Sequence, residues 1–295
     1  MENIKLKQPK IIFFGTPEFG KIILEGLIKN NYKPILVVTN PDKPTGRKQL
    51  LNPPPVKLVA QKYNLSVLQP EKIKSCKLEI EKLKPDLIIL AAYGKIIPKE
   101  ILKIPKYGCL NVHPSLLPKY RGPSPIQATI LNGDIETGVT IILMDEKIDH
   151  GPIVSVSKFK IQNSKFNYQE LSKKLAHIGV KLLVKTIPKW IAGKIKAKPQ
   201  KEKMASYTKI IKKENGQIDW SKSNQEIERQ IRAFYPWPGA FTFLKKNDKK
   251  IMIKILEAEI SKDNKLIIKK VQPEGKKPMN FEDFKRGHYG INFPF

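Results

Sequence analysis

An amide, an imidazole and a carboxylate are the side chains of this sequence most suited to chemistry. Asn111 and His113 stand two residues apart in the segment NVHPSLLPKYRG, and Asp149 follows in the segment DEKIDHGPI. Because side chains two residues apart on a strand point to the same face, Asn111 and His113 can share one cleft. Pro114 cannot continue a strand's hydrogen-bond ladder, so the sequence predicts that this pair is presented where a strand ends.

Such a trio is suited to stabilising the oxyanion that forms when a carbonyl is attacked. An amide N–H and a protonated imidazole donate hydrogen bonds to that oxygen, and a nearby carboxylate favours the protonated imidazole and can relay a proton. A covalent route through Ser115 or Cys109 is disfavoured, because neither has the strained elbow sequence of an activated nucleophile. The alternative to a site is that Asn111 and His113 only satisfy one another beneath a loop.

The elements that must position these residues follow from apolar patterns. Continuous runs of Ile, Leu, Val and Phe predict buried strands, and the spacing of apolar residues over 19–29 predicts a helix after the first strand. Strands that alternate with helices indicate an α/β fold with a doubly wound, mainly parallel sheet, in which ligands bind beyond the carboxyl ends of the strands. The predicted strands cover residues 10–14, 35–40, 86–93 and 109–113.

A second domain is indicated later in the chain. A strand over 153–161 and a helix from about Tyr168 to Trp190 precede a segment rich in Lys, Gly and Pro. Beyond that segment, a helix over 223–234 and the short strands AFTFLK, KIMIKILEAEI and KLIIKKV indicate a small β-barrel. We expect a catalytic domain at 1–192, a linker at 193–208 and a C-terminal domain at 209–295.

Six segments, in the same order, resemble the 10-formyltetrahydrofolate-dependent formyltransferases. They are FFGTPEFG, NPDKPTGRKQLLNPPPVK, AAYGKIIP, NVHPSLLPKYRGPSPIQ, WPGAFT and QPEGKKPM. The resemblance implies a Rossmann-like formyltransferase domain followed by an OB-like barrel that binds tRNA. It also implies transfer of a formyl group from 10-formyltetrahydrofolate to the α-amino group of methionine on initiator tRNA, with Asn111, His113 and Asp149 as catalytic residues.

The same resemblance assigns two segments to the folate, which serves as the formyl donor. One is the SLLP turn after the strand that carries His113, and the other is the YGKII turn after the strand over 86–93. A pterin ring needs an apolar slot and backbone groups, which the second of these turns can supply, although it can also be an ordinary glycine turn. The expected contacts are Ser115, Leu116, Leu117, Pro118, Tyr93, Gly94, Lys95, Ile96 and Ile97.

Residues 40–57 form a long, proline-rich loop, and loops of this length are usually functional or disordered. By resemblance this loop contacts the acceptor end of tRNA, with Arg47 as the leading contact and Lys43 and Lys48 as phosphate partners. Gln49 and Leu50 stand where the family usually has more lysine. This departure lowers the positive charge expected of the loop.

The net charge is +28 over 295 residues, which favours a polyanionic partner such as RNA. However, the chain has 50 Lys against 5 Arg and is rich in Ile and Asn, as an A/T-rich coding bias would produce. Basicity alone therefore predicts RNA binding only weakly. Arginine in so lysine-rich a chain is expected where its planar fork cannot be replaced, most clearly at Arg47.

Several classes of protein and site are disfavoured. No apolar run approaches the roughly 18 residues of a membrane span, and the N-terminus lacks the apolar core of a secretion signal. Cys76 and Cys109 are expected to be unpaired thiols of a reducing cytoplasm. His113 and His150 lack the spacing of a zinc site, so no metal is expected, and the segment GTPEFG is not a dinucleotide fingerprint. We expect a cytoplasmic monomer without a membrane partner.

Two other functions stay open at this point. A formyltransferase acting on an amino sugar nucleotide would share the HPSLLPKYRG core, but the segments FGTPEFG and PSPIQ resemble the tRNA-dependent members. An RNA-binding module with an inactive folate fold is disfavoured, because all three catalytic positions are filled. Trp237 and Phe241 could stack on bases, but aromatic residues within PWPGAF are more typical of packing.

Overall fold

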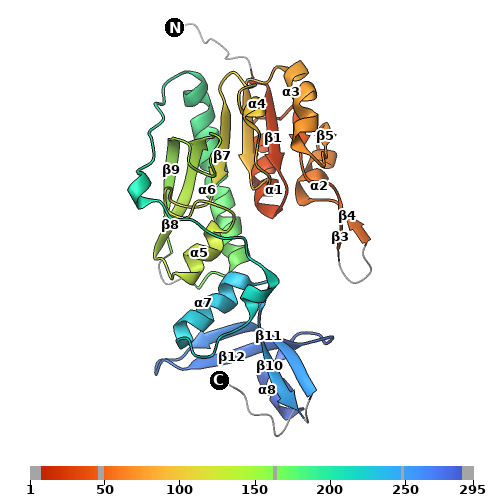
Figure 1. Cartoon of the computed structure of the whole chain (residues 1–295), viewed down its shortest axis with the longest axis vertical. Helices are drawn as coiled ribbons and strands as arrows, with labels where there is room; N and C mark the ends of the chain where they lie inside the picture. Colours follow the sequence, from red (N-terminus) through yellow and green to blue (C-terminus); the bar gives the residue numbers. More distant parts are fainter. Residues whose placement is uncertain (1–7, 46–49, 162–164, 247–248, 288–295) are drawn as a thin grey trace. The chain divides into compact units, whose positions relative to one another are not determined.

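The computed structural model describes residues 8–45, 50–161, 165–246 and 249–287, and the chain divides into two compact units (Figure 1). The chain passes between the units more than once, so neither unit is one continuous segment. Unit 1 contains Met1–Pro123, Thr137–Phe159 and Ser172–Tyr207, and unit 2 contains Ser124–Glu136, Lys160–Leu171 and Thr208–Phe295.

A seven-stranded sheet in the order β5-β2-β1-β6-β7-β8-β9 is the frame of unit 1 (Figure 1). The five strands from β5 to β7 are parallel, whereas β8 runs antiparallel to β7. The predicted α/β fold with a mainly parallel sheet is therefore confirmed. The strands are β1 (Ile11–Gly15), β2 (Leu36–Val38), β5 (Val67–Leu68), β6 (Leu87–Ala91), β7 (Cys109–His113), β8 (Glu136–Leu143) and β9 (Ile153–Lys160).

Helices cover both faces of this sheet, as a doubly wound fold requires. On one face, alternate residues of β1, β2 and β6 pack with the 3-10 helix η1 (Ile73–Cys76), α3 (Lys77–Leu83) and α4 (Lys99–Leu102). On the other face lie α1 (Glu18–Lys29) and α6 (Tyr168–Ile191), where Gly179 allows close approach to Ile23 and Val112. The helix α2 (Pro55–Lys62) packs beside α1, with Val56 next to Gly20.

An antiparallel sheet in the order β10-β11-β12-β13 is the frame of unit 2. Its strands are β10 (Ala240–Lys246), β11 (Lys249–Ile260), β12 (Leu266–Pro273) and β13 (Met279–Asn280), so the three strands predicted here are confirmed. Ser223 caps α7 (Asn224–Phe234) and exchanges hydrogen bonds with Glu226 in a capping box. Apolar residues of α7 and α8 (Phe281–Arg286) pack against this sheet, and α5 (Pro125–Leu131) contacts α7.

The predicted linker is held in order by contacts with unit 1. Lys198 forms a bridge with Ile153, and Tyr207 forms a bridge with Arg121. The 3-10 helix η2 (Glu202–Met204) lies between these bridges. We call residues 198–207 the connecting segment.

Within the predicted loop over 40–57, β3 (Lys43–Thr45) and β4 (Leu50–Asn52) form a two-stranded hairpin, and residues 55–57 already belong to α2. Arg47, Lys48 and Gln49, which the sequence assigns to the tip of this loop, lie outside the described residues. Among the helices that the structure describes, none combines the length and the apolar character needed to cross a bilayer.

Candidate active site

β7 presents Asn111 and His113 on one face of the sheet. Asn111 pairs with Leu90 of β6 and Ile142 of β8, and His113 pairs with Thr140 of β8. Asn111 is half-buried and the side chain of His113 is buried. The two predicted side chains therefore lie together where β7 ends, at the carboxyl end of the parallel strands.

Asp149 joins these two residues through its carboxylate. One oxygen accepts a hydrogen bond of 3.1 Å from the amide of Asn111, and the other lies 3.5 Å from Nδ1 of His113. The backbone N–H of Gly122 donates a further hydrogen bond of 2.8 Å to this second oxygen. The carboxylate of Asp149 thus contacts both of the other residues that the sequence singles out.

Both ring nitrogens of His113 face an oxygen atom. Its Nε2 lies 2.9 Å from the carbonyl oxygen of Tyr120, while Nδ1 faces the Asp149 carboxylate. The amide of Asn111 donates one hydrogen to Asp149, and the structure shows no acceptor for its second hydrogen among the described residues. Within the described part of the chain, this arrangement leaves one amide hydrogen of Asn111 available beside the ring of His113.

The SLLP turn after β7 is fixed by hydrogen bonds to its own backbone and to β8. The hydroxyl of Ser115 donates to the carbonyl of Lys119 at 2.7 Å, and Thr140 of β8 donates to the carbonyl of Ser115 at 2.7 Å. The backbone N–H of Leu117 donates to the hydroxyl of Thr140 at 3.1 Å. Ser115 and Leu117 are buried and Leu116 is half-buried, so Leu116 is the leucine of this turn with the more accessible surface.

The YGKII turn after β6 has both buried and exposed members. Tyr93 and Ile97 belong to the core, and burial raises the pKa of Tyr93 to about 12. Lys95 donates hydrogen bonds to the carbonyls of Pro70 and Glu71. The side chain of Ile96 is 71% exposed, and Gly94 is also exposed. An expected folate contact by Tyr93 or Ile97 would therefore involve the backbone.

Arg121 is a residue of the site whose role the sequence did not reveal. Its side chain is fully buried and donates hydrogen bonds to Gln200, Glu202 and Tyr207 of the connecting segment. The hydrogen bonds from Arg121 hold the pKa of Glu202 below its usual range. The available signal was an arginine inside the HPSLLPKYRG motif of a chain that otherwise uses lysine.

A set of hydrogen bonds closes the base of the 40–57 loop. Gln69 and Lys57 each donate to the carboxylate of Asp42 at 2.7 Å, and Gln69 also donates to the carbonyl of Asn40. The hydrogen bonds from Gln69 and then Lys57 hold the pKa of Asp42 below its usual range. Lys43 is exposed on β3. These hydrogen bonds fix the loop where it leaves the sheet, and we call the contacts of Asp42 with Gln69 and Lys57 the Asp42 clasp.

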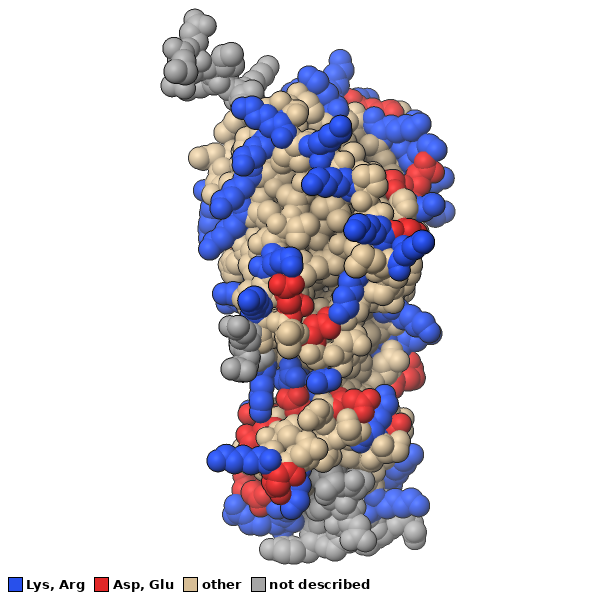
Figure 2. Space-filling view, turned by 90° about the vertical axis from the view of Figure 1, so that its left-hand side faces the viewer, with Lys and Arg blue, Asp and Glu red and all other residues tan. Residues whose placement is uncertain are grey.

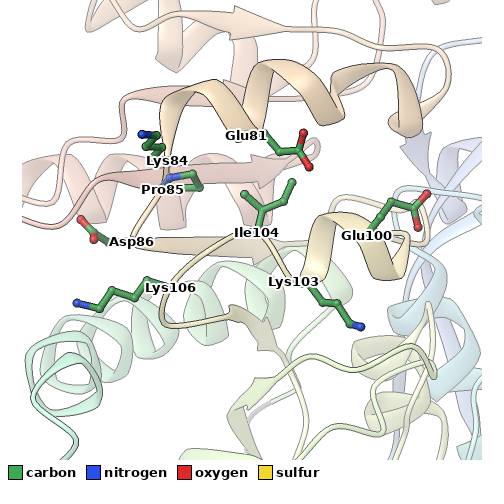
Figure 3. Close-up of a pocket in the computed structure, with 8 residues that line it drawn as sticks. All are labelled: Glu81, Lys84, Pro85, Asp86, Glu100, Lys103, Ile104 and Lys106. Carbon is green, nitrogen blue, oxygen red and sulfur yellow. The ribbon is translucent and has the colours of Figure 1, made fainter.

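A separate pocket of about 570 Å³ lies near the opposite end of the sheet (Figure 3). It lies near the starts of β6 and β7, whereas Asn111 and His113 lie near the other end of β7. Basic and acidic side chains alternate around it, which gives it no single charge preference. It is lined by Glu81, Lys84, Pro85, Asp86, Glu100, Lys103, Ile104 and Lys106.

Other candidate reactive groups are engaged in structural contacts. Burial raises the pKa of the Cys109 thiol to about 12, and it also raises that of Cys76. His150 contacts Asp145 at 2.6 Å. Within the described ranges, no group of three or more His, Cys, Asp or Glu side chains is arranged to hold a metal ion.

The basic side chains of the chain are widely distributed. In Figure 2, Lys and Arg are scattered over the visible surface, separated by areas of other residues and by smaller groups of Asp and Glu. This distribution does not isolate one basic patch, as expected if much of the charge reflects composition.

Comparisons with known proteins agree with this architecture. Residues 9–187 match the family model described as formyl transferase, and residues 210–266 match the model described as formyl transferase, C-terminal domain. A methionyl-tRNA formyltransferase of Bacillus velezensis is 44% identical over 94% of this chain and 94% of its own length. One of Thermodesulfovibrio yellowstonii is 43% identical over 94% of this chain and 95% of its own length.

Solved structures share the fold at lower identity. A methionyl-tRNA formyltransferase from Clostridium thermocellum matches with a TM-score of 0.59 and 20% identity, covering 90% of this chain and 98% of its own. An N-formyltransferase from Helicobacter canadensis, solved with folinic acid and dTDP-3-aminofucose, matches with a TM-score of 0.64 and 24% identity, covering 86% and 88%.

Proposed function

We propose a function for this chain, which belongs to the formyl transferase family. The protein transfers a formyl group from 10-formyltetrahydrofolate to the α-amino group of methionine on initiator tRNA. The relatives that match over nearly their whole length are named methionyl-tRNA formyltransferases. The observation that carries the proposal is the contact of Asn111, His113 and Asp149 at the carboxyl end of β7.

The reaction needs no nucleophile from the protein, because the methionyl amine attacks the formyl carbon. The formyl oxygen then becomes an oxyanion, which the second amide hydrogen of Asn111 is placed to bind. The protonated ring of His113 adds a positive charge beside it. Asp149 keeps that ring oriented and accepts a proton from the attacking nitrogen. Collapse of the intermediate breaks the bond between the formyl carbon and the folate nitrogen, which takes up the proton that Asp149 accepted.

The two turns beside the trio are the proposed folate contacts. Leu116 and Ile96 offer accessible apolar surface, and Gly94 leaves the backbone open to a flat ring. The remaining assigned residues, Ser115, Leu117, Pro118, Tyr93, Lys95 and Ile97, build the two turns.

The tRNA acceptor end is proposed to meet the 40–57 loop. Lys43, Arg47 and Lys48 would contact its phosphates. The Asp42 clasp would fix the position at which the loop leaves the sheet. The C-terminal unit is the proposed second tRNA contact. We further propose that the enzyme acts in the cytoplasm as a monomer.

The decisive experiment compares His113→Ala with His177→Ala, a change at an exposed histidine of α6. We expect His113→Ala to lower the rate of formyl transfer to charged initiator tRNA by about 100-fold or more, while His177→Ala transfers like the wild type. Full activity of His113→Ala would refute the assignment. A dTDP-linked amino sugar serves as the second acceptor, and faster formylation of that sugar than of methionyl-tRNA would favour the sugar nucleotide alternative.

A further inference from the structure

We propose that Gln200 of the connecting segment is a positioning residue that holds the backbone of Asp149, so that its carboxylate meets Asn111 and His113. This inference rests on the proposed function and deepens it. It extends the site to a residue that contacts no reacting atom.

Both the nitrogen and the oxygen of the Gln200 side-chain amide form hydrogen bonds. Its nitrogen donates to the carbonyl of Asp149 at 2.8 Å and to the carbonyl of Gly151 at 2.7 Å. Its oxygen accepts from Nε and Nη2 of Arg121 at 3.1 and 3.0 Å. An amide has two donors and two acceptor positions, so this geometry uses all of them. No other side chain of similar length can both donate to the two carbonyls and accept from Arg121.

Arg121 gives Gln200 a fixed support. The guanidinium is fully buried and holds both oxygens of Glu202 at 2.9 Å. It also donates to the hydroxyl of Tyr207 at 2.8 Å. Because the guanidinium is planar, these contacts set the direction of the N–H groups that face Gln200.

Both the side chain and the backbone carbonyl of Asp149 accept hydrogen bonds from this region. Its carboxylate accepts from the N–H of Gly122, the residue after Arg121, and its carbonyl accepts from Gln200, which Arg121 orients. Two consecutive residues, Arg121 and Gly122, therefore restrain Asp149: Gly122 binds its carboxylate, and Arg121 orients the amide that binds its carbonyl.

Asp149 needs this restraint because its backbone is unusual. Its φ of +48° lies in the left-handed region, which residues with a Cβ rarely adopt. Two residues later, a Cβ at Gly151 would come 1.9 Å from the carbonyl oxygen of Leu143, so the loop passes against β8 at this point. The two hydrogen bonds from Gln200 span this turn. Without them, Asp149 can relax to an extended backbone that turns its carboxylate away from His113.

The experiment measures formyl transfer to methionyl-tRNA by Gln200→Glu and Gln200→Leu. Gln200→Glu retains the acceptor for Arg121 but loses both donors to the Asp149 turn. We expect each variant to lower kcat by about 10- to 100-fold, as loss of a supporting residue does at other sites, with little change in KM for either substrate. Gln230→Leu is the matched control, because the amide of Gln230 also donates to two backbone carbonyls, those of Asn215 and Gln217, but in unit 2. We expect its kcat to equal that of the wild type.

A double-mutant cycle with Asp149→Ala separates positioning from general destabilisation. If Gln200 acts through Asp149, then Gln200→Leu lowers the residual rate of the Asp149→Ala enzyme by less than about 2-fold. A full 10-fold or greater loss on that background would overturn the inference, as would an unchanged kcat in Gln200→Glu. Thermal unfolding of each variant shows that the enzyme assayed is folded. Absence of transfer by the wild-type enzyme would instead refute the proposed function itself.

Discussion

The ring of His113 lies between two acceptors, the carboxylate of Asp149 and the carbonyl of Tyr120, which is 2.9 Å from its Nε2. The histidine of the site is thus engaged before any substrate arrives. In the proposed reaction His113 acts from this fixed position, while the amide of Asn111 supplies the hydrogen-bond donor.

The stability of the Asp42 clasp, at the base of the 40–57 loop, should depend on pH. Because the folded pKa of Asp42 lies below its usual range, its stabilising contribution is present above that usual range and is lost as pH falls through the folded value. We expect the protection of amides in residues 40–57 against hydrogen exchange, measured relative to the intrinsic exchange rate at each pH, to fall upon acidification below pH 4. Asp42→Asn should show fast exchange already at pH 7, whereas Glu79→Gln, at an exposed carboxylate of α3, should behave like the wild type.

Arg47→Ala should weaken tRNA binding and reduce its salt dependence. A lost phosphate contact is expected to raise KM for charged tRNA by about 10-fold and to lower the salt slope of binding by roughly one ion. The KM for the folate donor should not change. Titrations at several salt concentrations test this prediction, and an unaltered slope would remove Arg47 from the proposed tRNA contacts.

Both cysteines should resist alkylation while the protein is folded. Burial raises the pKa of Cys109 to about 12 and raises that of Cys76, so few thiolates exist at pH 8. Mass spectrometry after iodoacetamide treatment should show little modification of the native protein and two modified cysteines after denaturation. Rapid modification of native Cys109 would contradict its buried position.

Gly26→Ala should destabilise unit 1, because the added Cβ would lie 2.4 Å from the side chain of Val180. We expect a loss of about 1–3 kcal/mol in the free energy of unfolding, typical of overpacking. The contact joins α1 to α6, and Val180→Ala removes the clashing atoms. The double variant should therefore be more stable than the sum of the two single changes predicts, as measured by denaturant unfolding.

The main features of unit 1 could be predicted because burial leaves a local pattern. The runs that became β1, β2, β6 and β7 are continuous apolar stretches, and the alternation over Cys109–His113 places Asn111 and His113 on one face. β8 is absent from the prediction, although its residues are almost all buried. Its antiparallel direction depends on the sheet around it, and an apolar run carries no information about direction.

The contacts of the connecting segment could not be predicted from its composition. Lysine, glycine and proline are typical of a loose linker, yet Gln200 and Tyr207 are joined to Arg121, some 80 residues earlier. Such pairing depends on tertiary structure rather than on neighbours in the sequence. The proposed roles of Asn111, His113 and Asp149 come from chemistry, and the structure adds their mutual distances.

The bridge between Arg121 and Tyr207 also determines where the catalytic part of the chain can be cut. An enzyme shortened at residue 192 would retain all seven strands of its large sheet, yet it would lack the side-chain amide of Gln200 that binds the backbone of Asp149. We therefore expect a fragment that extends through Tyr207, and so keeps Gln200 and its contact with Arg121, to transfer the formyl group faster than the shorter one.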